Sequence, residues 1–174
     1  MLAKEGDKAL VISKYALDCQ QYNTSRKSVT WETCTLREWL NGTFINNAFS
    51  SEEQNMIQST TVTADEKPSY FTSPGNNTTD KIFLLSIKEV NEYFSSDEAR
   101  KCASTEYAKA QGAWTSSSDS AGGKATCYWW MQSPGHFSRS AACVNYGGSV
   151  NKSGNDVEYD YYGVRPALWI NLGS

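Results

Sequence analysis

The sequence predicts a single α+β domain, with short helices early in the chain and an antiparallel meander of strands late. Helix-start signals gather in the first hundred residues, at 35–38, 50–53 and 86–89. Short strand-like runs separated by glycine-rich turns follow after Cys127. This order is typical of an α+β domain rather than of a parallel α/β sheet. The length fits one domain covering residues 1–174.

Composition excludes several classes of partner. A net charge of -3 and a pI near 5.2 leave no basic stripe for nucleic acid. No apolar run approaches the length of a membrane span, and no signal-peptide pattern opens the chain. Six Trp and ten Tyr are enough that several must form the core or line a site. We expect a soluble chain with neither a nucleic-acid nor a membrane partner, and its oligomeric state is left open.

The five cysteines are scattered singly, at Cys19, Cys34, Cys102, Cys127 and Cys143. None has the CxxC spacing or the nearby histidine of a structural zinc site, so we expect no zinc. The odd count and the wide separations favour buried or incidental thiols in a reducing compartment, with one disulfide as the alternative.

Local signals place the elements of the first two thirds of the chain. The apolar run at 8–13 predicts a buried strand. Thr35 and Glu38 have the spacing of a capping box, and Gly42 stands where that helix would stop. We further expect a capped helix from 50, strands at 60–63 and 81–85, a loop at 68–80, a helix from 86 to about 94, one short helix within 97–111, and a surface loop at 114–124.

The C-terminal third consists of two aromatic blocks, 128–135 and 163–171, around a polar segment, 137–162. Of the 26 residues in this segment, 16 are Asn, Asp, Ser, Gly or Tyr, which leaves too little apolar surface to build a core. We therefore predict a polar, tyrosine-rich face displayed on a scaffold that the two blocks anchor.

Valine spacing divides this region into short strands. Valines recur every six or seven residues, at Val144, Val150, Val157 and Val164. Each strand would then send one side chain inward and its neighbours outward. A primed hairpin turn with positive φ is expected at Gly147 and Gly148, and a second turn at 153–156.

The outward side chains of such a meander have the composition of antibody-type binding surfaces. Tyrosine gives a large amphipathic contact area with only two rotatable bonds, and Ser, Asn and Gly adapt their hydrogen bonds. The alternative is an ordinary polar, glycine-rich hairpin, but four tyrosines in the segment favour binding. The predicted ligand-binding residues are His136, Phe137, Arg139, Asn145, Tyr146, Asn151, Lys152, Asn155, Asp156, Glu158, Tyr159, Asp160, Tyr161 and Tyr162.

Blocks at 31–41, 48–50, 80–86, 129–135 and 163–168 carry a resemblance to a known family. In this order they resemble an uncharacterised family of bacterial domains that is abundant in gut-associated Gram-positive bacteria. That family is similar to the C-type-lectin-like domains, which include formylglycine-generating enzymes and the variable proteins of diversity-generating retroelements. The resemblance covers nearly the whole chain and implies a C-type-lectin-like fold. The N-terminal strand usual in that family is not found, as in a domain excised from a larger cell-surface protein.

The variable proteins have a C-terminal segment that is rewritten at adenine positions and displays its substitutions on the lectin-like scaffold. The segment 137–162 lies where such a region would lie. Its Asn, Tyr, Ser and Asp residues are products that mutagenised Asn codons give, and so are His136, Phe137, Arg139 and Cys143. The resemblance therefore implies binding through a hypervariable ligand face.

Calcium is the cofactor of many lectins and needs several oxygen ligands. Asn155, Asp156, Glu158 and Asp160 could supply some of them. No loop has a recognisable calcium spacing, however, so we expect neither a metal nor another cofactor.

An enzymatic reading would centre on His136, the only histidine. It could pair with Cys127, Cys143 or Ser133 for nucleophilic chemistry. No motif such as GxSxG supports this pairing, and a loop histidine is more often a contact residue.

Four residues of the two blocks are expected to be structural. Trp129, Trp130 and Trp169 are assigned to the core. Arg165 stands in a strand-like run and should be at least partly buried, so its guanidinium needs paired acceptors. We expect a carboxylate such as Glu32 or Glu38 to supply them.

The sequence as a whole predicts a non-enzymatic binding module in which segment 137–162 recognises a protein or a glycan. The first alternative is a structural or adhesive module of a larger surface protein, without a dedicated pocket. The second, less favoured, is an enzyme that uses His136 and a cysteine.

Overall fold

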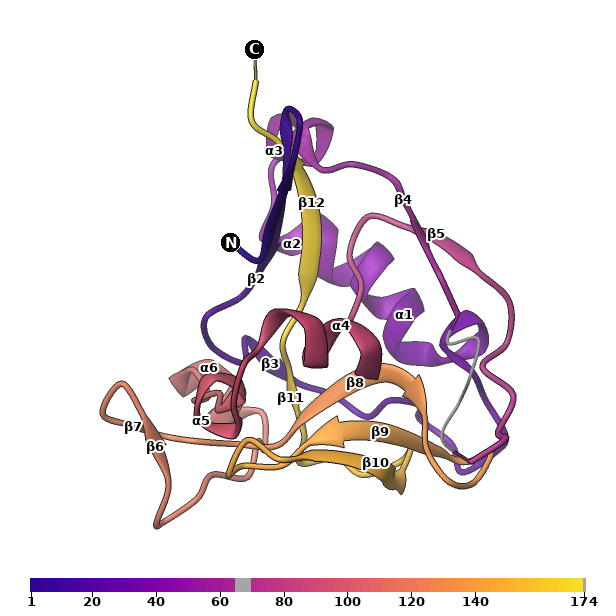
Figure 1. Ribbon diagram of the computed structural model, residues 1–174, viewed down its shortest axis with the longest axis vertical. Helices are drawn as coiled ribbons and strands as arrows, with labels where there is room; N and C mark the ends of the chain where they lie inside the picture. The colour runs from indigo at the N-terminus through magenta and orange to yellow at the C-terminus, as the bar shows by residue number, and fades with distance from the viewer. Residues whose placement is uncertain (65–69, 174) are drawn as a thin grey trace.

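The computed structural model describes residues 1–64 and 70–173 and shows an α+β domain, as predicted (Figure 1). One sheet has three antiparallel strands in the order β1 (Ala3–Glu5), β2 (Lys8–Ile12) and β12 (Ala167–Asn171). The predicted strand at 8–13 is therefore confirmed as β2, and β1 precedes it. Because β2 lies between β1 and β12, both N-terminal strands belong to the same sheet as the last strand of the domain. Among the described residues, no helix is long and apolar enough to cross a membrane.

The second sheet contains the predicted meander. β8 (Trp129–Pro134), β9 (Ser140–Val144) and β10 (Val150–Asp156) are antiparallel neighbours. The chain then crosses to β11 (Gly163–Val164), which pairs parallel with β8 and antiparallel with β3 (Asp18–Cys19). This crossover carries the tyrosines that precede β11 back over the sheet.

β9 is buried along its whole length. Val144, Val157 and Val164 are fully buried as predicted, whereas Val150 is partly exposed. The segment 137–162, predicted to have too little apolar surface to build a core, therefore contributes a whole buried strand to it in addition to the expected inward valines. Its alanines and its cysteine are small, so β9 fits between packed layers that larger side chains would push apart.

The hairpin between β9 and β10 lies where it was predicted, but its turn is of another type. The Gly148 N–H donates to the Asn145 carbonyl at 2.8 Å, and only Gly148 of the glycine pair has a positive φ, of 89°. A primed turn of the predicted kind needs positive φ at both central residues. The prediction of a second turn at 153–156 is wrong, because these residues belong to β10. The register of β10 against β9 shifts between Asn151 and Asn155, as in a β-bulge, and Gly154, with a φ of 68°, lies in this stretch.

The first helical region differs from its prediction at both ends. Thr35 begins α1 (Thr35–Trp39) rather than capping it, and Cys34 is the N-cap residue. Gly42 does not end the helix, since a π-helical turn (Leu40–Phe44) continues it into α2 (Ile45–Ala48). Buried Leu40 and Ile45 flank this turn. Their packing outweighs the helix-stopping tendency of one partly buried glycine.

The two later capping boxes are confirmed. Ser50 and Glu53 exchange hydrogen bonds before α3 (Ser51–Met56), and Ser86 and Glu89 do so before α4 (Ile87–Tyr93). These signals are local, since the side chain and the N–H group that it serves are three residues apart.

Two regions hold more structure than predicted. Residues 97–111 contain two helices, α5 (Asp97–Arg100) and α6 (Glu106–Ala110), rather than one. The expected surface loop at 114–124 includes a small hairpin of β6 (Ser120–Ala121) and β7 (Lys124–Ala125).

The predicted strand at 81–85 is wrong. Ile82, Phe83, Leu84 and Leu85 are buried, but only Phe83 forms an isolated bridge, with Ala167. The Asn41 side chain takes the place of a partner strand: it donates to the Ile82 carbonyl at 2.8 Å and accepts from the N–H of the same residue at 3.0 Å. An apolar run indicates burial, and burial alone does not make a strand.

β4 (Thr60–Val62) confirms the strand predicted at 60–63, and it pairs with β5 (Thr78–Asp80). β5 lies inside the predicted loop at 68–80, whose residues 68 and 69 fall outside the described residues.

Arg165 is buried, as predicted, but not beside a carboxylate. Its Nε donates to the Ser13 carbonyl at 2.9 Å, and its guanidinium lies 5.2 Å from the Phe94 ring and 5.0 Å from the Trp129 ring. Burial lowers the pKa of this guanidinium. Aromatic faces and carbonyl oxygens hold this charge.

The carboxylates predicted to pair with Arg165 lie elsewhere. Glu32 accepts from the Asn76 side chain at 3.1 Å, and Glu38 is exposed on α1. Trp129 and Trp130 are fully buried as predicted, while Trp169 is only partly so.

All five cysteines are free, buried thiols, so the disulfide alternative is excluded. Burial raises the pKa of Cys19 to about 11 and the pKa of Cys34 to about 12. Both values lie above the ordinary thiol value of 9.0, so the folded state favours the protonated thiols.

Alkali is therefore expected to destabilise the domain. The stabilisation from a raised thiol pKa is complete below pH 9 and is lost as the pH rises through the folded values. Melting temperatures measured between pH 7 and 12 should fall from about pH 9. A Cys34→Ala variant should have a shallower decline over that range, and an unchanged melting temperature up to pH 11 in the native chain would contradict this expectation.

Candidate ligand-binding surface

Five neighbouring aromatic side chains form a partly exposed surface over the second sheet, which we call the aromatic platform. Its members are Trp114, Tyr128, Tyr146, Tyr159 and Tyr161. The rings of Trp114, Tyr128 and Tyr146 form a triangle with centroid separations of 5.2, 5.3 and 5.4 Å. Tyr161 lies 6.2 Å from Tyr128 and 5.3 Å from Tyr159, which extends the platform. Such spacings are typical of favourable ring contacts.

Exposure across the platform is graded. Trp114 is 42% exposed, while Tyr128, Tyr146, Tyr159 and Tyr161 are partly exposed. Each tyrosine is therefore partly covered by the domain and partly accessible to solvent. The expectation that Tyr146, Tyr159 and Tyr161 face water is thus met only in part.

Tyr162 does not belong to this surface, and its predicted outward position is wrong. It is 1% exposed and stacks beneath Tyr128, with ring centroids 5.0 Å apart and ring planes 5° apart. Its ring also lies 4.2 Å from that of Trp130 and 4.9 Å from that of Tyr161. The side chain of Asn155 donates to its hydroxyl. Tyr162 is the support that fixes the platform to the core.

Sequence reasoning missed Trp114 and Tyr128. The N–H of Trp114 donates to the Tyr161 carbonyl at 3.0 Å, which brings a distant loop against the segment before β11. The sequence signal for Trp114 is its position in a Ser/Gly-rich loop, because such a loop has no core of its own in which to bury a tryptophan.

The five platform side chains are one Trp and four Tyr, so the platform itself contains no Asp, Glu, Lys, Arg or His. Burial raises the pKa of Tyr128 and of Tyr161, so their hydroxyls stay protonated. The surface therefore offers ring faces together with neutral donors and acceptors.

Several predicted contact residues support the local backbone. The Asn145 side chain donates to the Ser149 hydroxyl at 3.0 Å within the β9–β10 turn, and Asn151 accepts from the Gly154 N–H at 3.1 Å within the bulge of β10. Asn155 is directed inward, to the Tyr162 hydroxyl. Lys152 and Asp160 are exposed, as predicted.

The carboxylates considered for calcium form ion pairs instead. Asp156 lies 2.9 Å from Arg26 and 3.9 Å from Arg139, and Glu158 lies 3.7 Å from Arg26. Among the described residues, no group of three or more His, Cys, Asp or Glu side chains is arranged to hold a metal ion.

His136 and Phe137 are exposed and lie at the end of β8, apart from the platform's ring contacts. The His136 ring stacks on Tyr70 at 4.6 Å and on Phe137 at 4.5 Å, and the Arg139 guanidinium lies 5.5 Å from Phe137. Tyr70 is another residue that sequence reasoning missed.

The cysteines of the enzymatic alternative are directed elsewhere. Cys127 donates to the Cys102 carbonyl at 3.5 Å, and Cys143 accepts from the Asn155 side chain at 3.7 Å. Burial raises the pKa of Cys143 to about 11, which disfavours a thiolate nucleophile.

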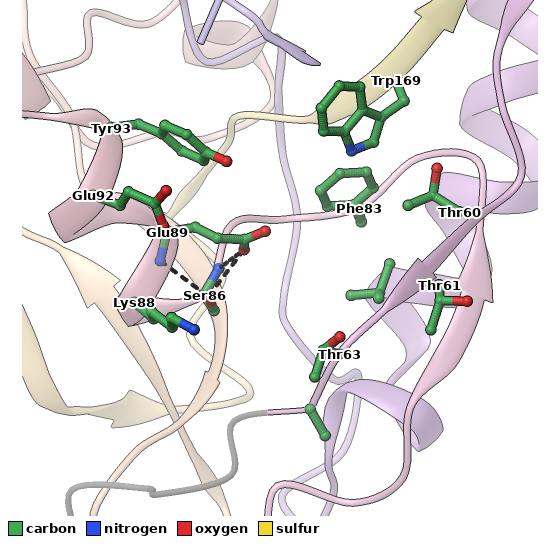
Figure 2. A pocket seen from close by; sticks show the side chains of 12 residues that line it. Thr60, Thr61, Thr63, Phe83, Ser86, Lys88, Glu89, Glu92, Tyr93 and Trp169 are labelled. Carbon is green, nitrogen blue, oxygen red and sulfur yellow. Dashed lines mark hydrogen bonds between the residues drawn. The ribbon is translucent and has the colours of Figure 1, made fainter. Parts of the chain in front are cut away.

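A separate hollow of about 600 Å³ lies between β4 and α4, and we call it the β4 cleft (Figure 2). Thr60, Thr61 and Thr63 line one wall, Glu89 and Lys88 the opposite one. Phe83, Tyr93 and Trp169 bound the hollow between these walls, and Figure 2 shows the Tyr93 hydroxyl directed into it.

The fold and these surfaces define an α+β domain with a supported aromatic surface and a separate polar cleft. The chain belongs to the family described as Domain of unknown function (DUF6273), whose model matches residues 6–172. No curated protein and no solved structure matches the chain.

Proposed function

We propose that the domain is a non-enzymatic binding module with a C-type-lectin-like fold, and that its aromatic platform recognises a protein or a glycan. The resemblance in the sequence supports the lectin-like assignment. The single observation that carries the function is the cluster of five partly exposed aromatic rings, which extends from Trp114 to Tyr159.

Rigidity of the platform supports a binding role. Tyr128 is stacked on buried Tyr162, and Tyr146 contacts both Tyr128 and Trp114. Rings that are already held in place lose little conformational entropy when a ligand binds. Solubility alone does not require exposed aromatic rings, and Trp and Tyr are enriched where binding energy concentrates.

The chemistry of the platform suits the two ligand classes. A ring face stacks on the apolar face of a sugar or on an apolar side chain, and neutral phenol groups add hydrogen bonds without a charge requirement. Ion-paired Arg26, Asp156 and Glu158 lie outside the ring cluster and leave the platform neutral.

The direct test is to screen the purified domain against an oligosaccharide array and a displayed peptide library. Trp114→Ala and Tyr146→Ala should each weaken selected binders at least about tenfold, which corresponds to about 1.4 kcal/mol. Both variants should retain the cooperative thermal unfolding of the parent chain.

Tyr107→Ala is the matched control, because Tyr107 is 60% exposed on α6 and takes no part in the ring contacts that define the platform. It should bind like the parent. Selected binders that tolerate both platform substitutions, or two screens without a selective binder, would contradict the proposal.

A further inference from the structure

The β4 cleft is lined by a strand edge. Five consecutive residues line it, namely the three of β4 and the two that follow, Thr63 and Ala64. Successive side chains of a strand point to opposite faces, so a hollow beside one face would be lined by alternate residues only. A hollow lined by every residue lies along the edge, where the backbone is exposed. β5 pairs with β4, and Figure 2 shows α4 on the other side of the cleft.

This edge has unused backbone hydrogen-bonding groups. In an antiparallel pair, each strand directs alternate N–H and C=O groups to its partner and the others away from it. Among the described residues, no hydrogen bond outside the β4–β5 pairing reaches the backbone of β4. At the end of the strand, the Thr63 carbonyl accepts from Gln132 at 3.4 Å, and the Ala64 N–H donates to Asn77 at 2.8 Å. The groups of β4 that face away from β5 are therefore available at the free edge of a strand whose residues line the cleft.

The opposite wall is mainly acidic. Glu89 uses one carboxylate oxygen, Oε2, to cap α4 through Ser86, at 2.8 and 2.9 Å. Glu92 is exposed one helical turn later, and neither carboxylate forms an ion pair within the described part of the chain. Lys88 is the cation of this wall. Two carboxylates against one ammonium favour a basic partner side chain.

Aromatic groups reinforce this preference. Tyr93 and Trp169 border the cleft, and desolvation together with Glu92, Glu89 and Glu5 raises the pKa of Tyr93. Glu5 is balanced by Lys8, whose ammonium lies 3.2 Å from it and 4.7 Å from the Trp169 ring. Glu89 and Glu92 of α4 are therefore the main source of negative potential at Tyr93. A cation bound there would contact these carboxylates and a ring face.

We propose that the β4 cleft binds an extended peptide segment of a partner protein, which adds as a strand to the free edge of β4 and directs a lysine or arginine side chain toward Glu89 and Glu92. Main-chain hydrogen bonds then supply affinity, and the acidic wall and the aromatic boundary supply selectivity. This site is distinct from the aromatic platform, and neither proposal depends on the other.

The test uses an acetylated and amidated octapeptide that alternates valine and threonine around one central lysine, followed by amide NMR of the labelled domain. Saturable shifts are expected below about 1 mM peptide at Thr60 to Ala64 and not at the platform. The peptide bonds of the octapeptide fall into two alternating sets, whose N–H groups point to opposite edges of the strand. N-methylation of one set should weaken binding about tenfold and N-methylation of the other set should weaken it little, because only one edge of the peptide would face β4.

The acidic wall is tested by Glu92→Gln, which removes a charge from an exposed position without a change of shape. Binding should weaken about two- to fivefold, and replacing the peptide lysine by norleucine should abolish this difference. Glu106→Gln, at an exposed position on α6, is the control and should leave binding unchanged.

Three results would overturn the proposal. They are no amide NMR shift at β4, equal weakening of binding by N-methylation of either alternating set of peptide bonds, or shifts at β4 with maltohexaose and none with the peptide. All three leave the platform proposal standing, because its substitutions and its resonances lie elsewhere.

Discussion

Replacing Tyr162 with alanine is expected to lower the free energy of unfolding by about 3–5 kcal/mol, as for other large aromatic core truncations. The ring is 1% exposed and packs between Trp130, at 4.2 Å, and Tyr128, at 5.0 Å. Its removal leaves a cavity under Tyr128 and leaves the Asn155 amide with the Cys143 sulfur, at 3.7 Å, as its remaining acceptor. The platform should also lose its support, so ligand binding should weaken together with stability.

Urea unfolding measures this effect, and two variants bracket it. Tyr162→Phe keeps the ring but removes the hydroxyl that accepts from the Asn155 amide, whose remaining acceptor is the Cys143 sulfur at 3.7 Å, and this loss should cost about 1–2 kcal/mol. Tyr107→Ala should change the free energy of unfolding by less than about 0.5 kcal/mol, because that ring is exposed. If Tyr162→Ala lowers the free energy of unfolding by less than about 1 kcal/mol, Tyr162 faces solvent, as its sequence pattern predicts, and is not a core residue.

Gly148→Ala is expected to destabilise the domain by at least about 3 kcal/mol or to prevent folding. A Cβ atom at this position would lie 1.8 Å from the Asp97 carbonyl oxygen, and φ is 89°, a value that side-chain-bearing residues rarely adopt. The Arg100 side chain also donates to the Gly148 carbonyl, at 2.8 Å. The β9–β10 turn and α5 would therefore have to separate.

Gly147→Ala is the matched control for this substitution. A Cβ atom on Gly147 would meet nothing within 4 Å, and its φ is not positive. Its free energy of unfolding should stay within about 0.5 kcal/mol of the parent value. Equal stability of the two alanine variants would show that the turn does not press against α5.

Local signals in the sequence predict structure best where both partners of an interaction lie a few residues apart. The capping boxes at Ser50 and Ser86 depend on one side chain and an N–H group three positions later. The box predicted at Thr35 has the same spacing, yet the Thr35 hydroxyl accepts from the distant Thr24 N–H at 3.0 Å. A competing tertiary contact therefore decided between two similar motifs.

The candidate surface was predicted in part. Tyrosines before β11 and the meander beneath them follow from composition and valine spacing. Trp114 joins the surface through a backbone hydrogen bond to Tyr161, a residue far from it in the sequence. The β4 cleft likewise depends on how β4 and α4 approach each other. No spacing within the chain encodes that approach.

The sequence alone determined the α+β class, the order of most elements and the presence of a tyrosine-rich segment between two aromatic blocks. Periodicity and capping fix these features because they act over a few residues. The tertiary structure alone decided that Tyr162 points inward while Tyr161 stays partly exposed, and that Arg165 lies between aromatic rings. Neighbouring residues in an irregular segment have no periodic rule for direction, so packing against distant side chains sets which one is buried.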